Sequence, residues 1–461
     1  MTWIDYFTSS IVFWMAWVII PLIMEVMPAI FDSFILIKKK IVNRKRKELK
    51  YFPEITLIIP VYNSADTLKG CIRSIYESDY DNSLIHIMLV NNQGKDNSFE
   101  VFMECQQEFP GLSMNWMNAK QGKSKALNLA LFNSHGKYII HIDSDGELHK
   151  DALKNMITQF EQQEDVDCVT GVVLTNPRMI DETEGFFMRL FRKTEFFEYC
   201  QAFLAGRNFE SEFNSIYTLS GAFSAFRKST ILKTQLYNTD TVCEDTHVTF
   251  QVRNNLKKKV RICTDAFFFV DPIEDMNKLY TQRQRWQRGE MEVAHMFADR
   301  GLSSAKGFFS NFVVRLLMYD HTFAFPRMIW YFALICLAFM NYPMKLVVVS
   351  VLLIYLLYTL STFLFYLNIC SFLSKYKDLQ RYYRRKWYLV FLLPLFNFLV
   401  FWFRFAGIIN SIKGDQVWRT KNLTEEKETF LEIVKKDFSF FRKRAKKAKN
   451  KAMEKVNMDH E

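Results

Sequence analysis

The sequence lacks several patterns that would assign it to a class of protein directly. Its eight cysteines form no C-x-x-C pair and no metal-ligand spacing, which argues for reduced thiols and against a disulfide framework or a zinc site. No recognised nucleic-acid motif accompanies the net charge of +11, and the basic residues flank apolar segments, so we expect no nucleic-acid partner. No positive charge precedes the first apolar stretch, which argues against a cleavable signal peptide.

Aromatic residues are abundant by contrast, with 45 Phe and 20 Tyr among 461 residues, and they concentrate towards the two ends of the chain. This distribution predicts a multi-pass protein of the cell membrane. Residues 11–37 are mostly apolar and are followed by the basic run KKKIVNRKRK, as expected for a spanning helix whose end faces the cytoplasm. Glu25 interrupts the apolar run. A functional glutamate within the membrane and an interfacial one on a helix that ends early both remain open.

Apolar segments return after residue 301. Residues 323–340 and 346–373 predict two spanning helices, and the basic run at 374–386 brings the chain back to the cytoplasmic side. Residues 387–412 are long enough to span, but the strongly basic tail beyond them favours the cytoplasm, so we expect an in-plane or re-entrant segment. The predicted organisation is a membrane helix and basic flank (1–50), a cytoplasmic domain (51–301), membrane and interfacial helices (302–413) and a cytoplasmic tail (414–461).

The middle of the chain has the alternating pattern of an α/β domain. Strand-like runs at 54–62, 85–92, 138–145 and 165–174 alternate with helical periodicity at 64–78 and 150–163, with Ser64 as a candidate N-cap. This alternation predicts a mostly parallel sheet covered on both faces by helices. Residues 184–207 combine an apolar side with basic residues. They fit a helix lying in the membrane interface, and a core helix with a solvated basic face is the alternative.

Two carboxylates, Asp143 and Asp145, follow the strand-like run YIIHI. In parallel sheets, ligands bind beyond the carboxyl ends of the strands. Neighbouring carboxylates repel each other unless a cation joins them, and Mg²⁺ or Mn²⁺ takes such oxygen ligands together with substrate phosphates. A D-x-D sequence alone is weak evidence, because it also occurs in many solvated turns.

The other motifs of the chain, taken together with D-x-D, are more specific evidence than D-x-D alone. The chain contains, in order, IIPVYN (58–63), QGKSKALNLAL (121–131), the D-x-D, LSGAFSAFRKS (219–229), VCEDTHV (242–248) and TQRQRWQRG (281–289). Together these motifs resemble glycosyltransferase family 2, and more narrowly its membrane-embedded processive members that make cellulose, chitin, hyaluronan and poly-N-acetylglucosamine. The ordered motifs cover residues 51–289.

The resemblance implies a GT-A type domain, a nucleotide-sugar donor (a UDP-sugar in most relatives), Mg²⁺ or Mn²⁺, and an inverting reaction that gives a β-linked product. It implies that Asp245 is the general base, with Glu244 beside it, and that Asp145 and Asp143 hold the metal. The donor nucleotide would contact Pro60, Tyr62, Asn63, Asn91, Asn92, Lys123 and Asp143. The acceptor and diphosphate would contact Gln282, Arg285, Trp286, Ser220 and Gly221. Near the C-terminus, Trp418, Arg419 and Thr420 resemble a gating loop that covers the nucleotide.

Two positions depart from the family pattern. Asn91 and Asn92 stand where relatives carry two aspartates, one of which accepts from uracil N3–H, and Ser64 stands where many relatives have Glu. An Asn carbonyl can accept the same hydrogen bond without charge assistance. We therefore expect either weaker binding of uracil or a different base.

Other interpretations remain for the single residues and for the whole chain. Lys123 and Arg285 could be surface cations, Trp286 an interfacial anchor, and Glu244–Asp245 an acidic pair at a helix N-terminus. For the chain, the main hypothesis is a processive synthase that threads a growing glycan through its membrane helices, with lipid contacts and export partner proteins as further partners. Single transfer to a lipid-linked acceptor and an inactive membrane scaffold are the alternatives. The intact D-x-D and Glu-Asp pairs favour an enzyme.

Overall fold

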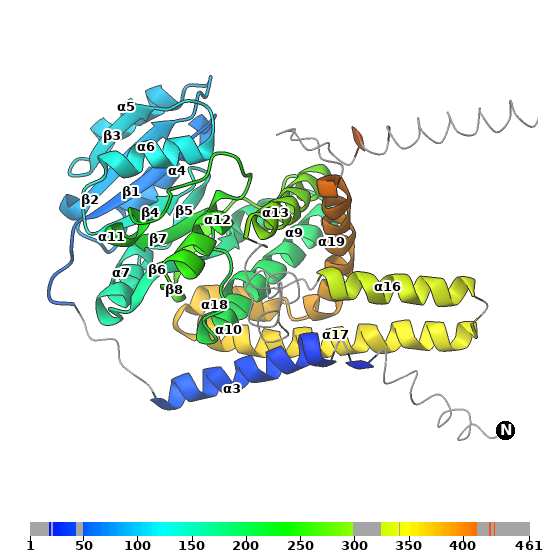
Figure 1. Cartoon of the computed structure of the whole chain (residues 1–461). Helices are drawn as coiled ribbons and strands as arrows, with labels where there is room; N and C mark the ends of the chain where they lie inside the picture. The colour runs from blue at the N-terminus through cyan, green and yellow to red at the C-terminus, as the bar shows by residue number, and fades with distance from the viewer. Residues whose placement is uncertain are drawn as a thin grey trace, which may run out of the picture.

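The computed structural model describes residues 18–19, 22–42, 49–297, 324–340, 342–412, 424–425 and 428. Within these residues an α/β domain lies beside a group of long helices, as Figure 1 shows in blue to green for the domain and yellow to orange for most of the helices. The chain enters this arrangement through a π-helical turn, η1 (Leu22–Val26), and α3 (Met27–Val42), which lies along α17 (Met344–Phe372).

The domain is built on one eight-stranded sheet with the order β3-β2-β1-β4-β7-β6-β8-β5. The strands are β1 (Ile55–Val61), β2 (Ile85–Asn91), β3 (Ser113–Asn118), β4 (Tyr138–Ile142), β5 (Gly146–Leu148), β6 (Val166–Thr175), β7 (Phe223–Arg227) and β8 (Lys259–Val270). The four strands β3, β2, β1 and β4 are parallel, while β7 runs antiparallel to both β4 and β6. The residues that follow β1, β2 and β4 therefore gather at one edge of the sheet.

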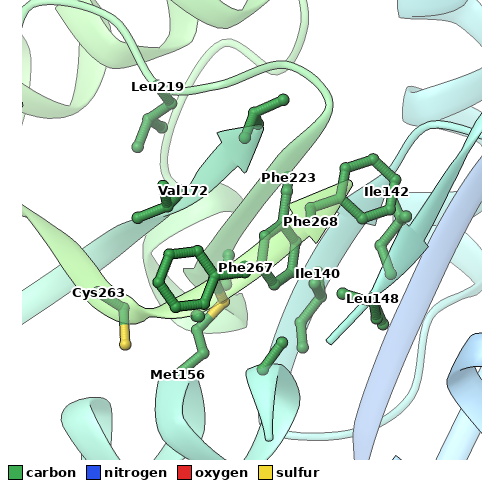
Figure 2. Close-up of a cluster of buried hydrophobic side chains, with 14 of the residues drawn as sticks. Ile140, Ile142, Leu148, Met156, Val172, Leu219, Phe223, Cys263, Phe267 and Phe268 are labelled. Atoms are coloured by element: carbon green, nitrogen blue, oxygen red, sulfur yellow. The ribbon is translucent and has the colours of Figure 1, made fainter. Parts of the chain in front are cut away.

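Helices cover the sheet as the alternating pattern predicted. They are α4 (Ala65–Tyr76), α5 (Ser98–Glu108), α6 (Lys123–Asn133) and α7 (Ala152–Gln162), with the short elements η2 (Asn82–Leu84), α8 (Pro177–Glu182) and α11 (Lys228–Ile231) between strands. β4 and β6 are buried along their whole length, which explains their nearly continuous apolar sequences. Figure 2 shows one part of the core, where Phe223, Phe267 and Phe268 lie among aliphatic side chains such as Ile140. Each such buried side chain contributes about 1.5–3 kcal/mol.

The segment predicted as one helix over 184–207 is a continuous helical stretch with a π-helical middle. It consists of α9 (Phe186–Tyr199), η3 (Cys200–Gly206) and α10 (Arg207–Glu212). Phe187 at its start is 83% exposed, whereas Phe197 is fully buried in the core. Each of the two alternatives therefore describes one part of the stretch. The exposed, apolar first turn has the character of an interfacial helix, and the second half is a core helix. The remaining helical elements of the domain are α12 (Glu244–Phe250), η4 (Gln251–Asn255) and α13 (Met276–Phe297).

Beyond the domain, the described elements are α16 (Ala324–Phe339), α17, η5 (Leu373–Lys375), α18 (Lys377–Arg385) and α19 (Leu389–Ile412). Two stretches, Met344–Lys375 and Leu389–Asn410, are long and apolar enough to cross a membrane. α16 and α17 run side by side, while α19 contacts both and crosses their direction in Figure 1. Helices that cross steeply cannot both follow the bilayer normal, but the crossing alone does not say which of them follows it, and residues 387–412 were predicted to lie in the membrane plane. That position itself stays a prediction, as does the span at 11–37, part of which lies outside the described residues.

Candidate functional site

Lys123, at the start of α6, connects three of the sequence motifs. Its Nζ lies 2.5 Å from Asp143 Oδ1 and 3.8 Å from Glu244 Oε1, and it donates to the carbonyl oxygen of Gly221 at 3.5 Å. Burial disfavours the charged amine, but the two carboxylates more than offset this and raise the pKa of Lys123. The lysine is therefore a fixed cation at the end of β4, and it is not the surface cation that the sequence left open.

The Glu244 carboxyl is half-buried at the start of α12, in contact range of that lysine. Burial is the main cause that raises the pKa of Glu244. Lys123 opposes this effect and the neighbouring Asp245 adds to it. The pair thus belongs to the same charge cluster as the D-x-D motif, although it stands about 100 residues further along the chain.

Asp145 differs from Asp143 in having no cationic partner. Its side chain is exposed to solvent and makes no hydrogen bond or ion pair with another described residue. The surrounding protein and the nearby Asp143 carboxylate nevertheless raise the pKa of Asp145 to about 6. A carboxylate of this kind is stabilised by a cation. Within the part of the chain that the structure describes, no group of three or more His, Cys, Asp or Glu side chains is arranged to hold a metal alone. The residues therefore fit an ion such as Mg²⁺ or Mn²⁺ that completes its shell with ligand oxygens.

The Asp245 carboxylate lies against the S-G motif. Its Oδ1 accepts the backbone N–H of Thr246 at 2.7 Å, and its backbone oxygen accepts from Thr249 Oγ1 at 2.6 Å. A Cβ atom on Gly221 would lie 2.9 Å from Asp245 Oδ2, a contact too short for any larger residue to make without a shift. A larger residue at this position would displace the Asp245 carboxylate, so the glycine lets the chain pass close beside it.

Ser220 is buried beneath that glycine and is bonded to an arginine that the sequence analysis missed. Ser220 Oγ accepts from Arg207 Nη1 at 3.1 Å, and its backbone N–H donates to Thr170 Oγ1 at 3.0 Å. Arg207 is only 7% exposed, and its guanidinium lies 5.2 Å from the ring centroid of Phe203. Its place at the end of the apolar and basic run at 184–207 was the only signal of it in the sequence.

The Q-x-x-R-W motif lies on α13, where the i, i+3, i+4 spacing brings Gln282, Arg285 and Trp286 to one side of the helix. Arg285 is exposed, and Gln282 and Trp286 are half-buried. α13 packs very closely on the chain just before Glu244, since a Cβ on Gly289 would lie 2.0 Å from Cys243 Sγ. This contact sets the position of the motif relative to the Glu-Asp pair.

A second arginine missed by the sequence analysis holds the tryptophan. Arg283 is 1% exposed, lies 2.5 Å from Glu198 Oε2 on α9, and its guanidinium is 4.4 Å from the Trp286 ring centroid. Trp286 also contacts Phe203 edge-on, with ring centroids 6.1 Å apart. Trp286 is thus held inside the domain by specific partners, which disfavours its alternative interpretation as an interfacial anchor.

The remaining candidate residues lie at the ends of β1 and β2 and in the turns that follow these strands. Pro60 is half-buried, the Tyr62 ring is 54% exposed, and Asn63 Oδ1 accepts the backbone N–H of Lys95 at 2.8 Å. Asn91 and Asn92 both bond to neighbouring loops, Asn91 to Gly94 and Asn118 and Asn92 to Gly122. These side chains are neutral, in contrast to the charged cluster after β4.

Ser64 stands at the N-cap position of α4, as the sequence predicted, although its side chain does not make the cap. Its hydroxyl lies 2.7 Å from the hydroxyl of Ser144, the middle residue of the D-x-D motif. The residue thus joins the end of β1 to the D-x-D turn. The candidate gating-loop residues Trp418, Arg419 and Thr420 lie outside the described residues.

Comparisons with known proteins agree with this geometry. A family model described as "Glycosyl transferase family 2" matches residues 56–231. The poly-beta-1,6-N-acetyl-D-glucosamine synthase of Staphylococcus epidermidis is 25% identical over 267 residues, which are 56% of this chain and 61% of that protein. The enzyme of the same name from Staphylococcus aureus strain MSSA476 is 24% identical over 240 residues, 52% of this chain and 55% of that protein. The match thus spans less than two thirds of either relative.

Among solved structures, the mannosyltransferase PcManGT from Pyrobaculum calidifontis, in complex with GDP-Man and Mn²⁺, has a similar fold. The TM-score is 0.52 at 18% sequence identity, and the alignment covers 75% of this chain and 94% of that one. At this identity the likeness concerns the fold, which extends well beyond the segment matched by the family model.

Proposed function

This chain carries a glycosyltransferase family 2 domain with the predicted GT-A fold, and from that premise we propose that it is an inverting membrane glycosyltransferase. It transfers a sugar from a nucleoside diphosphate donor to a hydroxyl group of a glycan and thereby extends a β-linked extracellular polysaccharide. The curated relatives are named as synthases of such a polymer. Two helices that could cross a membrane lie next to the domain, in keeping with a membrane-bound synthase.

The observation that carries the proposal is the convergence of three motifs on Lys123. Asp143 Oδ1 and Glu244 Oε1 lie 2.5 and 3.8 Å from its Nζ, and Gly221, which also contacts Lys123, borders Asp245. A donor diphosphate at this point would meet a lysine cation on one side and the Glu-Asp pair on the other. The diphosphate leaving group and the proposed general base, Asp245, would then lie close to each other.

Asp145 is the proposed main metal ligand, with Asp143 beside it. Asp143 is already paired with Lys123, whereas Asp145 has a free carboxylate and a raised pKa. Mg²⁺ or Mn²⁺ held here would act as a Lewis acid on the diphosphate leaving group. Lys123 would bind a phosphate oxygen as a point charge and so help to orient the donor.

Asp245 is the proposed general base. Its carboxylate accepts the proton of the attacking acceptor hydroxyl while the hydroxyl oxygen forms a bond to the anomeric carbon. The bond from that carbon to the diphosphate oxygen breaks, and the nucleoside diphosphate leaves with the bonding electron pair. Attack and departure occur on opposite faces, so an α-linked donor gives a β-linked product. A single displacement of this kind needs no enzyme nucleophile.

The acceptor would lie along α13. Trp286, fixed by Arg283 and Phe203, offers an aromatic face to the terminal sugar, while the exposed Arg285 and the half-buried Gln282 supply polar contacts. Ser220 and Gly221 border the same space beside Asp245. We propose that the catalytic domain faces the cytoplasm.

The test offers purified full-length protein, in detergent or nanodiscs, a panel of UDP- and GDP-sugars with Mg²⁺ or Mn²⁺. We expect metal-dependent release of nucleoside diphosphate from one donor, together with a β-linked product whose length is measured by gel or mass spectrometry. A ladder of long products supports chain extension, and a single added sugar on a lipid supports the alternative of one transfer. Absence of turnover with every donor and metal, in protein that remains folded, would refute the proposal.

A further inference from the structure

The orientation of the Asn92 side-chain amide is determined by the loop that it contacts. Its Oδ1 accepts the backbone N–H of Gly122 at 2.6 Å. A backbone N–H group can only donate, so the amide atom that faces it has to be the oxygen. The Nδ2 amino group is left with two N–H donors and makes no hydrogen bond to another residue that the structure describes. Asn92 therefore presents a donor, and its acceptor is already in use.

Asn91 is different although it is adjacent in sequence. Its Oδ1 accepts the backbone N–H of Gly94 at 3.0 Å, and its Nδ2 donates to Asn118 Oδ1 at 3.1 Å. Both ends of this amide are thus occupied by the protein. Of the two asparagines that depart from the family pattern, Asn92 is the one with a group left for a ligand.

The position of Asn92 is that of a contact to the base of the nucleotide. Its backbone N–H donates to the oxygen of Val61 at 2.8 Å, so it lies beside Tyr62, whose ring is more than half exposed. The charged cluster of Lys123 and Asp143 follows β4, and the sheet order β2-β1-β4 places it on the other side of β1. A nucleotide whose phosphates lie at the charged end extends its base towards the aromatic ring and the amide.

We propose that Asn92 sets the base selectivity of this site by donating an N–H to an acceptor atom of the base, so that a ring N–H of the base is not recognised. The inference rests on the proposed function, because it requires that a nucleotide binds at the candidate site. The chemistry is one of matching donors with acceptors. Uracil presents N3–H, a donor, between two carbonyl acceptors, whereas cytosine presents an acceptor at N3. An amino group facing N3–H would set donor against donor, and it can instead bond to O4 of uracil or to N3 of cytosine.

The experiment measures the affinities of UDP and CDP for the full-length protein in detergent with Mg²⁺, by calorimetry or fluorescence. These two nucleotides share the ribose and the diphosphate and differ only at one base edge. For the natural protein we expect CDP to bind with an affinity within about threefold of that of UDP, because the Asn92 amino group cannot accept a hydrogen bond from N3–H of uracil. Asn92→Asp keeps an oxygen for Gly122 and turns the other end into a charged acceptor, so UDP should gain about tenfold over CDP. Asn91→Asp changes the neighbouring amide, whose two ends are both occupied by the protein, and should shift the ratio of affinities less than Asn92→Asp does.

The outcomes separate the inference from the function on which it rests. A tenfold preference of the natural protein for UDP that Asn92→Asp leaves unchanged would overturn the inference while supporting a nucleotide site. The same holds if Asn91→Asp shifts the ratio as much as Asn92→Asp does, or more. If neither nucleotide binds to the folded protein, the proposed function fails and the inference fails with it. A larger shift of the ratio with Asn92→Asp than with Asn91→Asp supports both.

Discussion

The two ends of the candidate site consist of different kinds of side chain. The base end, formed by Tyr62, Asn63, Asn91 and Asn92, uses neutral side chains whose hydrogen bonds hold neighbouring loops. The transfer end, formed by Lys123, Asp143, Asp145, Glu244 and Asp245 together with α13, concentrates charge in half-buried surroundings.

The difference shows how each end can be perturbed. Neutral amides change their hydrogen-bonding pattern at modest cost, so the base end can change selectivity without loss of the fold. Buried charges depend on their partners, because a charge that loses its partner keeps the full penalty of desolvation. Arg283 with Glu198 is a fully buried pair of this kind, and Lys123 with Asp143 is a half-buried one. Substitutions at the transfer end should therefore have larger effects.

The largest effect is expected for Asp245→Asn, which removes the proposed general base. The residues that would contact the nucleotide base are unchanged. Transfer should fall by at least about a hundredfold, the usual contribution of a general base. Nucleotide binding should stay within about threefold of the natural protein, because Lys123 and Asp145 are unchanged. The measurements are product formation and nucleotide affinity on the same preparation. Turnover near that of the natural protein would refute the assignment of Asp245.

Glu198→Gln should have the next largest effect, and it acts on stability. The substitution removes the ion-pair partner of the buried Arg283 and should lower the free energy of unfolding by about 3 kcal/mol. Thermal unfolding in detergent measures this change. The control is Glu108→Gln, which breaks an exposed pair with Lys69 at 2.6 Å and should cost far less, because solvent screens that pair. Equal losses in the two variants would contradict the role given to the buried pair.

Asp145→Ala should weaken metal-dependent binding of the donor nucleotide by about tenfold to a hundredfold, the equivalent of about 1.4–2.8 kcal/mol. The part of nucleotide affinity that persists in EDTA should be unchanged, because Lys123 and the base end do not depend on the metal. Titrations of nucleotide with and without Mn²⁺ measure both parts. Glu147→Ala, at an exposed carboxylate two residues away, is the control. A metal effect of normal size in Asp145→Ala would exclude Asp145 as the main ligand.

The smallest effect concerns how the stability of the protein depends on pH through Glu195. This residue lies on α9, close to Arg283 of α13. Burial raises the pKa of Glu195 to about 7 from an ordinary value of 4.5. Between these values the folded protein binds more protons than the unfolded chain, so this carboxyl makes stability fall as the pH rises through that range. Glu195→Gln should remove the loss, so at pH 8 its free energy of unfolding should exceed that of the natural protein by on the order of 1 kcal/mol, measured by thermal unfolding. The advantage should vanish near pH 4.5. An equal difference at both pH values would show that Glu195 does not titrate as described.

Much of this architecture was accessible from local sequence pattern. The strands at 54–62 and 85–92 and the helix at 64–78 agree with β1, β2 and α4 to within two residues at each end. The D-x-D motif was placed correctly at the end of a buried strand. The antiparallel insertion of β7 between β4 and β6 was not foreseen, because no local pattern records which strand will be its neighbour.

The sequence by itself determined the elements and the order of the motifs, because apolar periodicity and turn residues act over a few neighbouring positions. Tertiary structure alone decided which polar atoms are free. It turned Ser64 away from its helix towards Ser144, 80 residues further on, and it occupied the oxygen of Asn92 with a loop 30 residues away. It also joined Arg283 to Glu198 across 85 residues. Hydrogen bonds and ion pairs depend on atoms that meet only after the chain has folded, so their partners cannot be read from neighbouring residues.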